Sequence, residues 1–211
     1  MPTNRRMSDP AYRRTEWKRR YEPHIRPVNR LVEKLRALHP GHVPYVSALY
    51  GGTSTEVLFL FQDPGPGTDE FGGSGFLSPE NDDDSAQMFS DCLDAVHLDV
   101  GRVLTWNACP WSLPDGQERP LVAQVEEGIE PLRQLVGLLP RLTAVVAMGR
   151  VAQGAWRRFE RRYPEVARQY RTFESPHTSK RGLVGGRTSR DGSIRRVKAA
   201  MRSALRVADS A

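Results

Sequence analysis

The chain has 211 residues and a net charge of +6, a length that suits one domain and is too short for two large ones. Its 38% hydrophobic and 27% charged residues exclude the disordered, collagen-like and coiled-coil classes. Two cysteines, Cys92 and Cys109, are too few for an iron–sulfur cluster or an all-cysteine zinc site, and no apolar run approaches the roughly 18 residues of a membrane span. We therefore expect a cytoplasmic protein without a metal or other cofactor, in which both cysteines are small buried side chains.

The first 23 residues carry many charges and few aliphatic side chains, which indicates a basic N-terminal arm before a single domain over residues 24–211. An amphipathic helix follows within residues 27–38, because apolar side chains recur there at helical spacing. Pro40 and Gly41 end this helix.

Four short apolar runs are typical of strands buried on both faces of a sheet. They span residues 56–61, 102–107, 143–148 and, with a weaker pattern, 171–174. Segments with helical periodicity lie between and after them, at 85–96 with Ser85 as the cap, 122–136, 151–163 and 194–208. Strands that alternate with helices predict a three-layer αβα sandwich around a central, mainly parallel four-stranded sheet.

Ligands of such sheets bind beyond the carboxyl ends of the strands, so the loops there hold the candidate residues. The first strand runs into Gln62-Asp63-Pro64-Gly65. Proline restricts the backbone and glycine has no side chain, so a substrate could approach the backbone of this loop closely. A carboxylate at the position of Asp63 can hold a water and oppose developing positive charge. The alternative is an ordinary turn in which Asp63 accepts backbone hydrogen bonds.

Phe76 and Asn107 are two further candidates in these loops. Phe76 follows a glycine-rich stretch and could present its ring to a nucleobase, or it could anchor the loop in the core. Asn107 ends the second strand, and its amide offers the donor and acceptor that match the adjacent C=O and N–H of a uracil-like edge. The alternative is a cap for the loop that follows.

The fourth strand runs into a basic loop that contains His177. A histidine donor there could meet developing negative charge while neighbouring side chains contact phosphates, or it could be an ordinary surface residue. The candidate phosphate contacts in this loop are Ser179, Lys180, Arg181 and Arg187.

Charge is segregated along the chain. Residues 1–39 carry a net +7, residues 40–149 a net −12 and residues 150–211 a net +11. Basic ends around an acidic middle suit a polyanionic partner, because Lys and Arg displace counterions from phosphates. A solvated arginine-rich surface is the alternative.

The order of these motifs resembles the uracil-DNA glycosylase superfamily over about residues 44–206. The resemblance implies that Asp63 positions a water and stabilises the sugar cation, and that the Gln62 backbone helps to hold the base carbonyl. It further implies that Phe76 stacks on the flipped base. The remaining implied roles are reading of the uracil edge by Asn107, a hydrogen bond from His177 to the uracil carbonyl and insertion of Arg181 into the duplex gap.

The chain departs from the uracil-specific branch at several of these positions. Gly65 stands where that branch has a tyrosine that blocks the thymine methyl, and it resembles the Pro-Gly of other branches. Thr178 and Arg181 replace a second proline and a leucine in the last motif. With only two cysteines, the resemblance implies a branch without an iron–sulfur cluster, and the preferred base stays open.

The function that follows is a DNA repair glycosylase, which hydrolyses the N-glycosidic bond of uracil or another deaminated or damaged base after base flipping. We expect a monomer at the nucleoid that acts on DNA and releases the free base. Three alternatives are a nucleic-acid-binding protein without turnover, a glycosylase that traps DNA covalently through His177, and a nucleoside hydrolase. A nucleoside hydrolase would have no evident use for the cationic loop.

Overall fold

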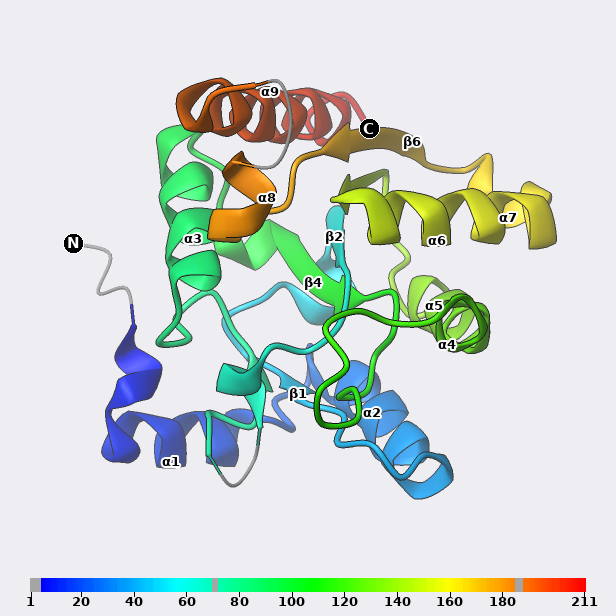
Figure 1. Cartoon of the computed structure of the whole chain (residues 1–211). Helices are drawn as coiled ribbons and strands as arrows, with labels where there is room; N and C mark the ends of the chain where they lie inside the picture. The colour runs from blue at the N-terminus through cyan, green and yellow to red at the C-terminus, as the bar shows by residue number, and fades with distance from the viewer. Residues whose placement is uncertain (1–4, 70–71, 185–187) are drawn as a thin grey trace.

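The computed structural model describes residues 5–69, 72–184 and 188–211, and their core is one parallel sheet (Figure 1). The strands are β2 (Val57–Phe61), β4 (Val103–Asn107), β5 (Ala144–Met148) and β6 (Arg171–Ser175). All pairings are parallel, and the order across the sheet is β4-β2-β5-β6. The predicted four-stranded parallel sheet is confirmed, and each strand lies within about a residue of the expected range.

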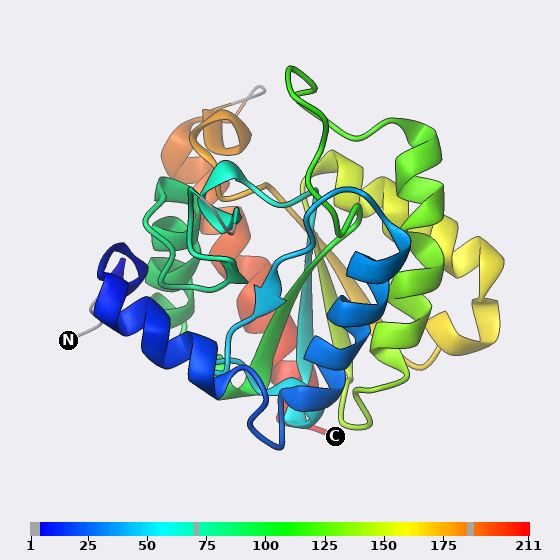
Figure 2. The same cartoon turned by 90° about the horizontal axis from the view of Figure 1, so that it is seen from below.

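Helices cover both faces of the sheet, so the predicted three-layer sandwich is also confirmed (Figures 1 and 2). One face is covered by α9 (Arg190–Ala208), against which α3 (Asp84–Ala95) packs. On the other face α6 (Arg150–Arg162) contacts the sheet, with α5 (Ile129–Val136) and α2 (Arg26–Leu38) beside it. Continuous burial of β2, β4 and β5 explains their apolar runs, while exposed residues on the edge strand β6 explain its weaker pattern.

Shorter elements connect these layers. A two-stranded parallel sheet joins β1 (Tyr45–Val46) to β3 (Phe76–Leu77). The remaining α-helices of the described residues are α1 (Pro10–Arg19), α4 (Val122–Glu127), α7 (Pro164–Ala167) and α8 (Lys180–Val184). Cys92 and Cys109 are buried free thiols, as expected. In the described ranges, no helix combines the length and apolar character needed to cross a membrane.

Two helix boundaries differ from the prediction. Asp83, not Ser85, caps α3, because Asp83 Oδ1 accepts hydrogen bonds from the backbone N–H groups of Ser85 and Ala86, each at 2.9 Å. The single helix expected over residues 122–136 is broken into α4 and α5 at Gly128. A Cβ at Gly128 would lie 1.9 Å from the carbonyl oxygen of Ala108, so only glycine fits at this contact.

The expected N-terminal arm is part of the domain in its described portion. Glu16 of α1 is fully buried, and it accepts hydrogen bonds from Ser47 Oγ at 2.7 Å and from Arg19 Nη1 at 2.8 Å. Trp17 packs edge-on against the ring of Tyr45, with centroids 5.4 Å apart. The predicted boundary at residue 23 therefore does not separate an arm from the domain in the described structure, because the hydrogen bond from Ser47 to the buried Glu16 and one aromatic side chain dock a helix that has almost no aliphatic face.

Candidate active site

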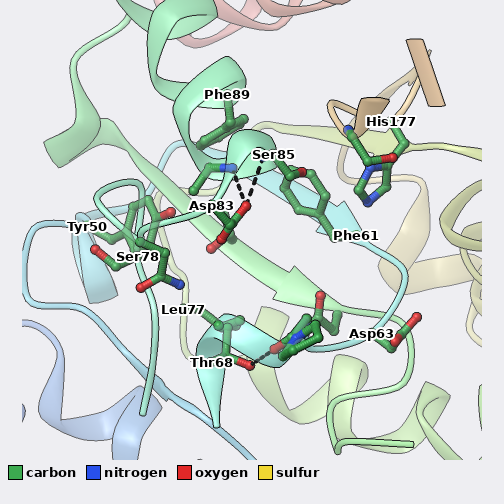
Figure 3. A pocket seen from close by; sticks show the side chains of 18 residues that line it. Tyr50, Phe61, Asp63, Thr68, Leu77, Ser78, Asp83, Ser85, Phe89 and His177 are labelled. Atoms are coloured by element: carbon green, nitrogen blue, oxygen red, sulfur yellow. Dashed lines mark hydrogen bonds between the residues drawn. The ribbon is translucent and has the colours of Figure 1, made fainter. Parts of the chain in front are cut away.

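A cavity of about 310 Å³ lies at the carboxyl ends of β2 and β4 (Figure 3). Its walls come from the loop after β2, the start of α3, the end of β4 and the loop after β6. Five of the predicted site residues line it: Asp63, Gly65, Asn107, His177 and Ser179. Segments that are distant in sequence therefore meet at one edge of the parallel sheet, as this fold class leads us to expect.

Strand register brings the first two motifs together. Phe61 is paired with Asn107 across β2 and β4. The pairing continues beyond the strands, where the N–H of Ala108 donates to the carbonyl oxygen of Phe61 and the N–H of Cys109 donates to that of Gln62, each at 2.9 Å. Gln62 itself does not line the cavity, so the geometry leaves it a backbone role beside the site.

Asn107 carries an unused hydrogen-bond donor. Its side chain is only 3% exposed, and Nδ2 is buried without a hydrogen-bond partner among the described residues. An unpaired buried polar group of this kind costs about 1–3 kcal/mol, so it calls for an explanation such as a ligand. A carbonyl oxygen of a bound molecule would satisfy this donor.

The hydrogen bonding of His177 defines its tautomer. The backbone N–H of Ser179 donates to His177 Nδ1 at 3.0 Å, so the neutral ring carries its proton on Nε2. Burial lowers the pKa of His177 to about 4, and the opposing charge of Asp83 only partly offsets this effect. At neutral pH His177 is therefore an uncharged residue that offers an N–H donor to the cavity.

Two glycines hold the His177 backbone in place. A Cβ at Gly149, where φ is +87°, would lie 3.1 Å from the Cβ of His177. A Cβ at Gly182 would lie 2.6 Å from the carbonyl oxygen of His177 and 2.7 Å from its Cβ. Phe61 supports the other side of the ring in an edge-on contact with centroids 5.2 Å apart. The position of the imidazole thus depends on the absence of two side chains and the presence of one aromatic ring.

Asp63 and Gly65 lie toward the mouth of the cavity. Asp63 is partly buried, and this burial raises the pKa of its carboxyl group, while a hydrogen bond involving Gln62 opposes the rise. Gly65 is exposed, and a Cβ there would meet nothing within 4 Å. Figure 3 shows the carboxyl group of Asp63 at the edge of the site, away from Asp83 and Tyr50.

Phe76 does not reach the cavity. Its side chain is fully buried and packs edge-on against Trp17, with ring centroids 6.0 Å apart. Successive side chains of a strand point to opposite faces, so Phe76 faces α1 while its neighbour Leu77 lines the cavity. As placed, Phe76 cannot stack on a base in this cavity, and that prediction is wrong in the described structure.

The cavity also contains polar residues that sequence reasoning missed. They are Ser78, Asn81 and Asp83 from the segment that leads into α3, and Ser85 from the first turn of α3. Their signal in the sequence is the acidic run over residues 82–84 directly before an amphipathic segment. That run is equally typical of the N-terminus of a helix without any functional role, because Asp is among the preferred capping residues.

The predicted DNA-contacting cations lie outside the cavity and are engaged in exposed ion pairs. Lys180 Nζ lies 2.5 Å from Asp84 Oδ2, and Arg181 Nη1 donates to Glu118 Oε2 at 3.0 Å. Exposed pairs of this kind contribute about 0–1 kcal/mol and are readily exchanged for other partners. Arg187 lies outside the described residues.

Within residues 5–69, 72–184 and 188–211, no three His, Cys, Asp or Glu side chains are grouped so that they could hold an ion.

The sheet order, the helical layers and the polar cavity define a three-layer α/β protein with its candidate site at the carboxyl edge of a parallel sheet. Neither a family model nor a curated protein sequence matches this chain. Among solved structures, the crystal structure of wild-type SMUG2 from Pedobacter heparinus is similar, with a TM-score of 0.51 and 13% sequence identity. The match covers 75% of this chain and 77% of the other. The chain therefore has a fold like that of SMUG2.

Proposed function

We propose that this protein is a DNA glycosylase of the uracil-DNA glycosylase type. It hydrolyses the N-glycosidic bond of uracil, or of another deaminated or damaged base, after the nucleotide has rotated out of the DNA stack. The observation that carries the proposal is a pair of donors in one cavity that have no partner among the described residues, Asn107 Nδ2 and the Nε2–H of neutral His177. The likeness to SMUG2, a member of the uracil-DNA glycosylase superfamily, supports the proposal at the level of the fold.

The two donors suit the leaving group of this reaction. When the bond to the sugar breaks, electrons flow into the base, and its carbonyl oxygens gain negative charge. Donors that are already oriented stabilise this charge without reorganisation during the reaction. Because His177 is neutral, its ring carries a single proton, on Nε2. In this proposal the ring stabilises the leaving base through a hydrogen bond and does not protonate it.

Asp63 has the opposite task at the mouth of the cavity. The sugar becomes cationic in the transition state, and a carboxylate on that side lowers its energy. The same group can orient the water that completes the hydrolysis. A carboxylate beside the sugar and neutral hydrogen-bond donors beside the base are the arrangement that the reaction requires.

Polar and basic residues that follow β6 in the chain contact the DNA in this proposal. Ser179, Lys180, Arg181 and Arg187 track phosphates, and Arg181 fills the gap that the extruded nucleotide leaves. The net charge of +11 over residues 150–211 supports this assignment. The protein acts as a monomer on chromosomal DNA in the cytoplasm and releases the free base.

The tautomer of His177 favours hydrolysis over covalent trapping of DNA. A histidine that attacks the sugar needs a free nitrogen lone pair directed at it. Here the lone pair of Nδ1 accepts the N–H of Ser179, and Nε2 carries the proton. His177 is therefore arranged as a donor and not as a nucleophile.

The decisive experiment measures base release from oligonucleotides that contain a single uracil, as single strands and as duplexes opposite adenine or guanine. Alkali-induced cleavage at the resulting abasic site reports excision, and a gel-shift assay on the same strands reports binding. We expect excision by the wild type and loss of it, with binding retained, in Asn107→Ala. Binding without any excision by the wild type would instead identify a nucleic-acid-binding protein, and a denaturant-stable adduct would identify covalent trapping.

A further inference from the structure

One side of the cavity is formed by a stretch of chain that we call the 72–85 segment. It contributes five of the lining residues, Leu77, Ser78, Asn81, Asp83 and Ser85. Between β3 and α3, residues 78–83 form neither helix nor strand. This side therefore lacks the ladder of backbone hydrogen bonds that holds β2 and β4, and contacts from elsewhere in the chain must fix it.

The N-terminal residues supply such contacts at Glu80. The N–H of Met7 donates to the carbonyl oxygen of Glu80 at 3.0 Å, and Arg6 Nε donates to Glu80 Oε1 at 2.8 Å. The side chain of Glu80 is only 13% exposed, and the Arg6 guanidinium also lies over the ring of Tyr12, 4.4 Å from its centroid. Neither Arg6 nor Glu80 lines the cavity, so this contact supports the 72–85 segment without touching a ligand.

A second contact lies near the start of the segment, beside α1 (Figures 1 and 2). Arg13 Nη1 donates to the carbonyl oxygen of Gly73 at 2.9 Å. Gly73 packs against Gly67, which lines the cavity, because a Cβ at Gly73 would lie 2.4 Å from the carbonyl oxygen of Gly67. The N–H of Ser74 donates to the same oxygen at 2.8 Å. Arg13 therefore holds a second point from which the cavity lining is positioned.

The charges of the 72–85 segment alternate with its lining residues. The acidic side chains at positions 80, 82 and 84 form ion pairs with Arg5 and Arg6. Asn81 and Asp83, which lie between these positions, line the cavity. One set of side chains thus serves for support and the other for lining. This arrangement gives a use to part of the N-terminal positive charge, which the proposed DNA contacts after β6 do not need.

We propose that Arg6 and Arg13 are positioning residues for the reaction. They act through Glu80 and Gly73 and hold the 72–85 segment in place beside the base in the cavity. This inference rests on the proposed glycosylase function. A base is oriented only if both sides of its cavity are fixed, and misplacement by about 1 Å can cost about 100-fold in rate. Strand register and glycine contacts hold the donors on one side, and the N-terminal residues hold the other side.

The test begins with Arg6→Gln, which removes the ion pair with Glu80. We expect kcat for uracil excision to fall by about 5- to 10-fold, because the segment is less well oriented. DNA affinity should change little, since Arg6 is not among the proposed phosphate contacts. Arg6→Lys keeps a cation opposite Glu80 and should restore most of the rate. Arg13→Met, which removes a donor to a neutral carbonyl oxygen, should act in the same direction with a smaller effect. Single-turnover kinetics and gel-shift titration measure these quantities.

Arg102→Gln is the matched control. Arg102 Nε donates to Glu56 Oε2 at 2.6 Å, and the side chain of Glu56 is 12% exposed, nearly the same as that of Glu80. This pair lies at the amino ends of β2 and β4, the edge of the sheet opposite the cavity. Both variants should lower the urea midpoint, but only Arg6→Gln should lower kcat. Equal kcat in the two variants would overturn the proposal.

A double-mutant cycle tests whether Arg6 acts through Glu80. If it does, Arg6→Gln combined with Glu80→Gln should be no slower than the slower single variant. Losses in kcat that multiply would mean that Arg6 acts by another route and would overturn the proposal.

Hydrogen–deuterium exchange without DNA separates this inference from the proposed function. Exchange in the 72–85 segment should be faster in Arg6→Gln than in the wild type, and unchanged in Arg102→Gln. If the wild type excises no base but exchange shows this pattern, the glycosylase proposal fails and the support of the segment by Arg6 stands. If excision occurs and Arg6→Gln alters neither exchange nor kcat, the positioning role fails and the glycosylase proposal stands.

Discussion

The inner wall and the outer rim of the cavity are held by different kinds of contact. The inner wall consists of Asn107, which is fixed by strand register, and His177, which is fixed by a backbone hydrogen bond and close glycine contacts. The outer rim consists of Lys180 and Arg181, which make only exposed ion pairs. The difference teaches that chemistry and DNA binding place opposite demands on neighbouring residues. Groups that meet a transition state must be oriented in advance, whereas groups that meet phosphates must be able to exchange partners.

The largest expected effect is at Asp63, between the two regions. Asp63→Asn removes the charge that stabilises the sugar cation and keeps the size of the side chain, so kcat for uracil excision should fall by about 100-fold or more. DNA affinity should change little, which single-turnover kinetics and gel-shift titration can measure together. Unchanged turnover would exclude Asp63 from the reaction and leave Asp83 as the carboxylate to examine.

The contact between Gly182 and His177 is the sharpest test of a preoriented inner wall. Gly182→Ala places a methyl group against the backbone of His177, and the resulting shift should lower kcat by about 10- to 100-fold with little change in DNA affinity. Gly154→Ala in α6 is the matched control, because its methyl group would meet only the end of the flexible Arg158 side chain. Equal activity of both variants would contradict the role of the glycine contact.

The variant Arg181→Ala tests the DNA-binding role of the outer rim. Arg181→Ala should weaken binding to duplex DNA several-fold and reduce the slope of log affinity against log salt by about one, while kcat at saturation changes little. Single-stranded DNA should be less affected, since it has no gap to fill. Arg168→Ala, which removes an exposed arginine directly after α7, is the control. An equal loss on both kinds of DNA would contradict insertion of Arg181 into the duplex.

The smallest effect at neutral pH concerns the charge state of His177. Because burial lowers its pKa to about 4, the folded state binds this proton less readily than the unfolded state, whose histidine pKa is near 6.5. Stability from this group is therefore complete above about pH 6.5 and is lost as pH falls toward 4, by at most about 3 kcal/mol. Urea denaturation between pH 7 and 4 should show this loss, and His177→Gln should reduce it. A pH dependence that is identical in the variant would place the titrating group elsewhere.

The sequence was most informative where burial is uniform. The runs at 56–61, 102–107 and 143–148 predicted β2, β4 and β5 correctly, because a strand covered on both faces needs apolar side chains at nearly every position. The sequence was misleading where a single side chain determines how a helix docks or where it begins. The docking of α1 through Glu16 leaves no periodic apolar signal, and the capping of α3 by Asp83 instead of Ser85 depends on which of two suitable residues precedes the first turn.

The contents of the cavity could be predicted only in part, for the same reason. By itself the sequence determined the parallel sheet and the loops at its carboxyl edge, and therefore the neighbourhood of Asp63, Asn107 and His177. Only the tertiary structure decided that Phe76 faces α1 while Leu77 faces the cavity, since a shift of one residue along a strand reverses the side chain. Only the tertiary structure likewise left Asn81 Oδ1 and Asn107 Nδ2 without partners, because hydrogen-bond satisfaction depends on every neighbour in space and not on spacing along the chain.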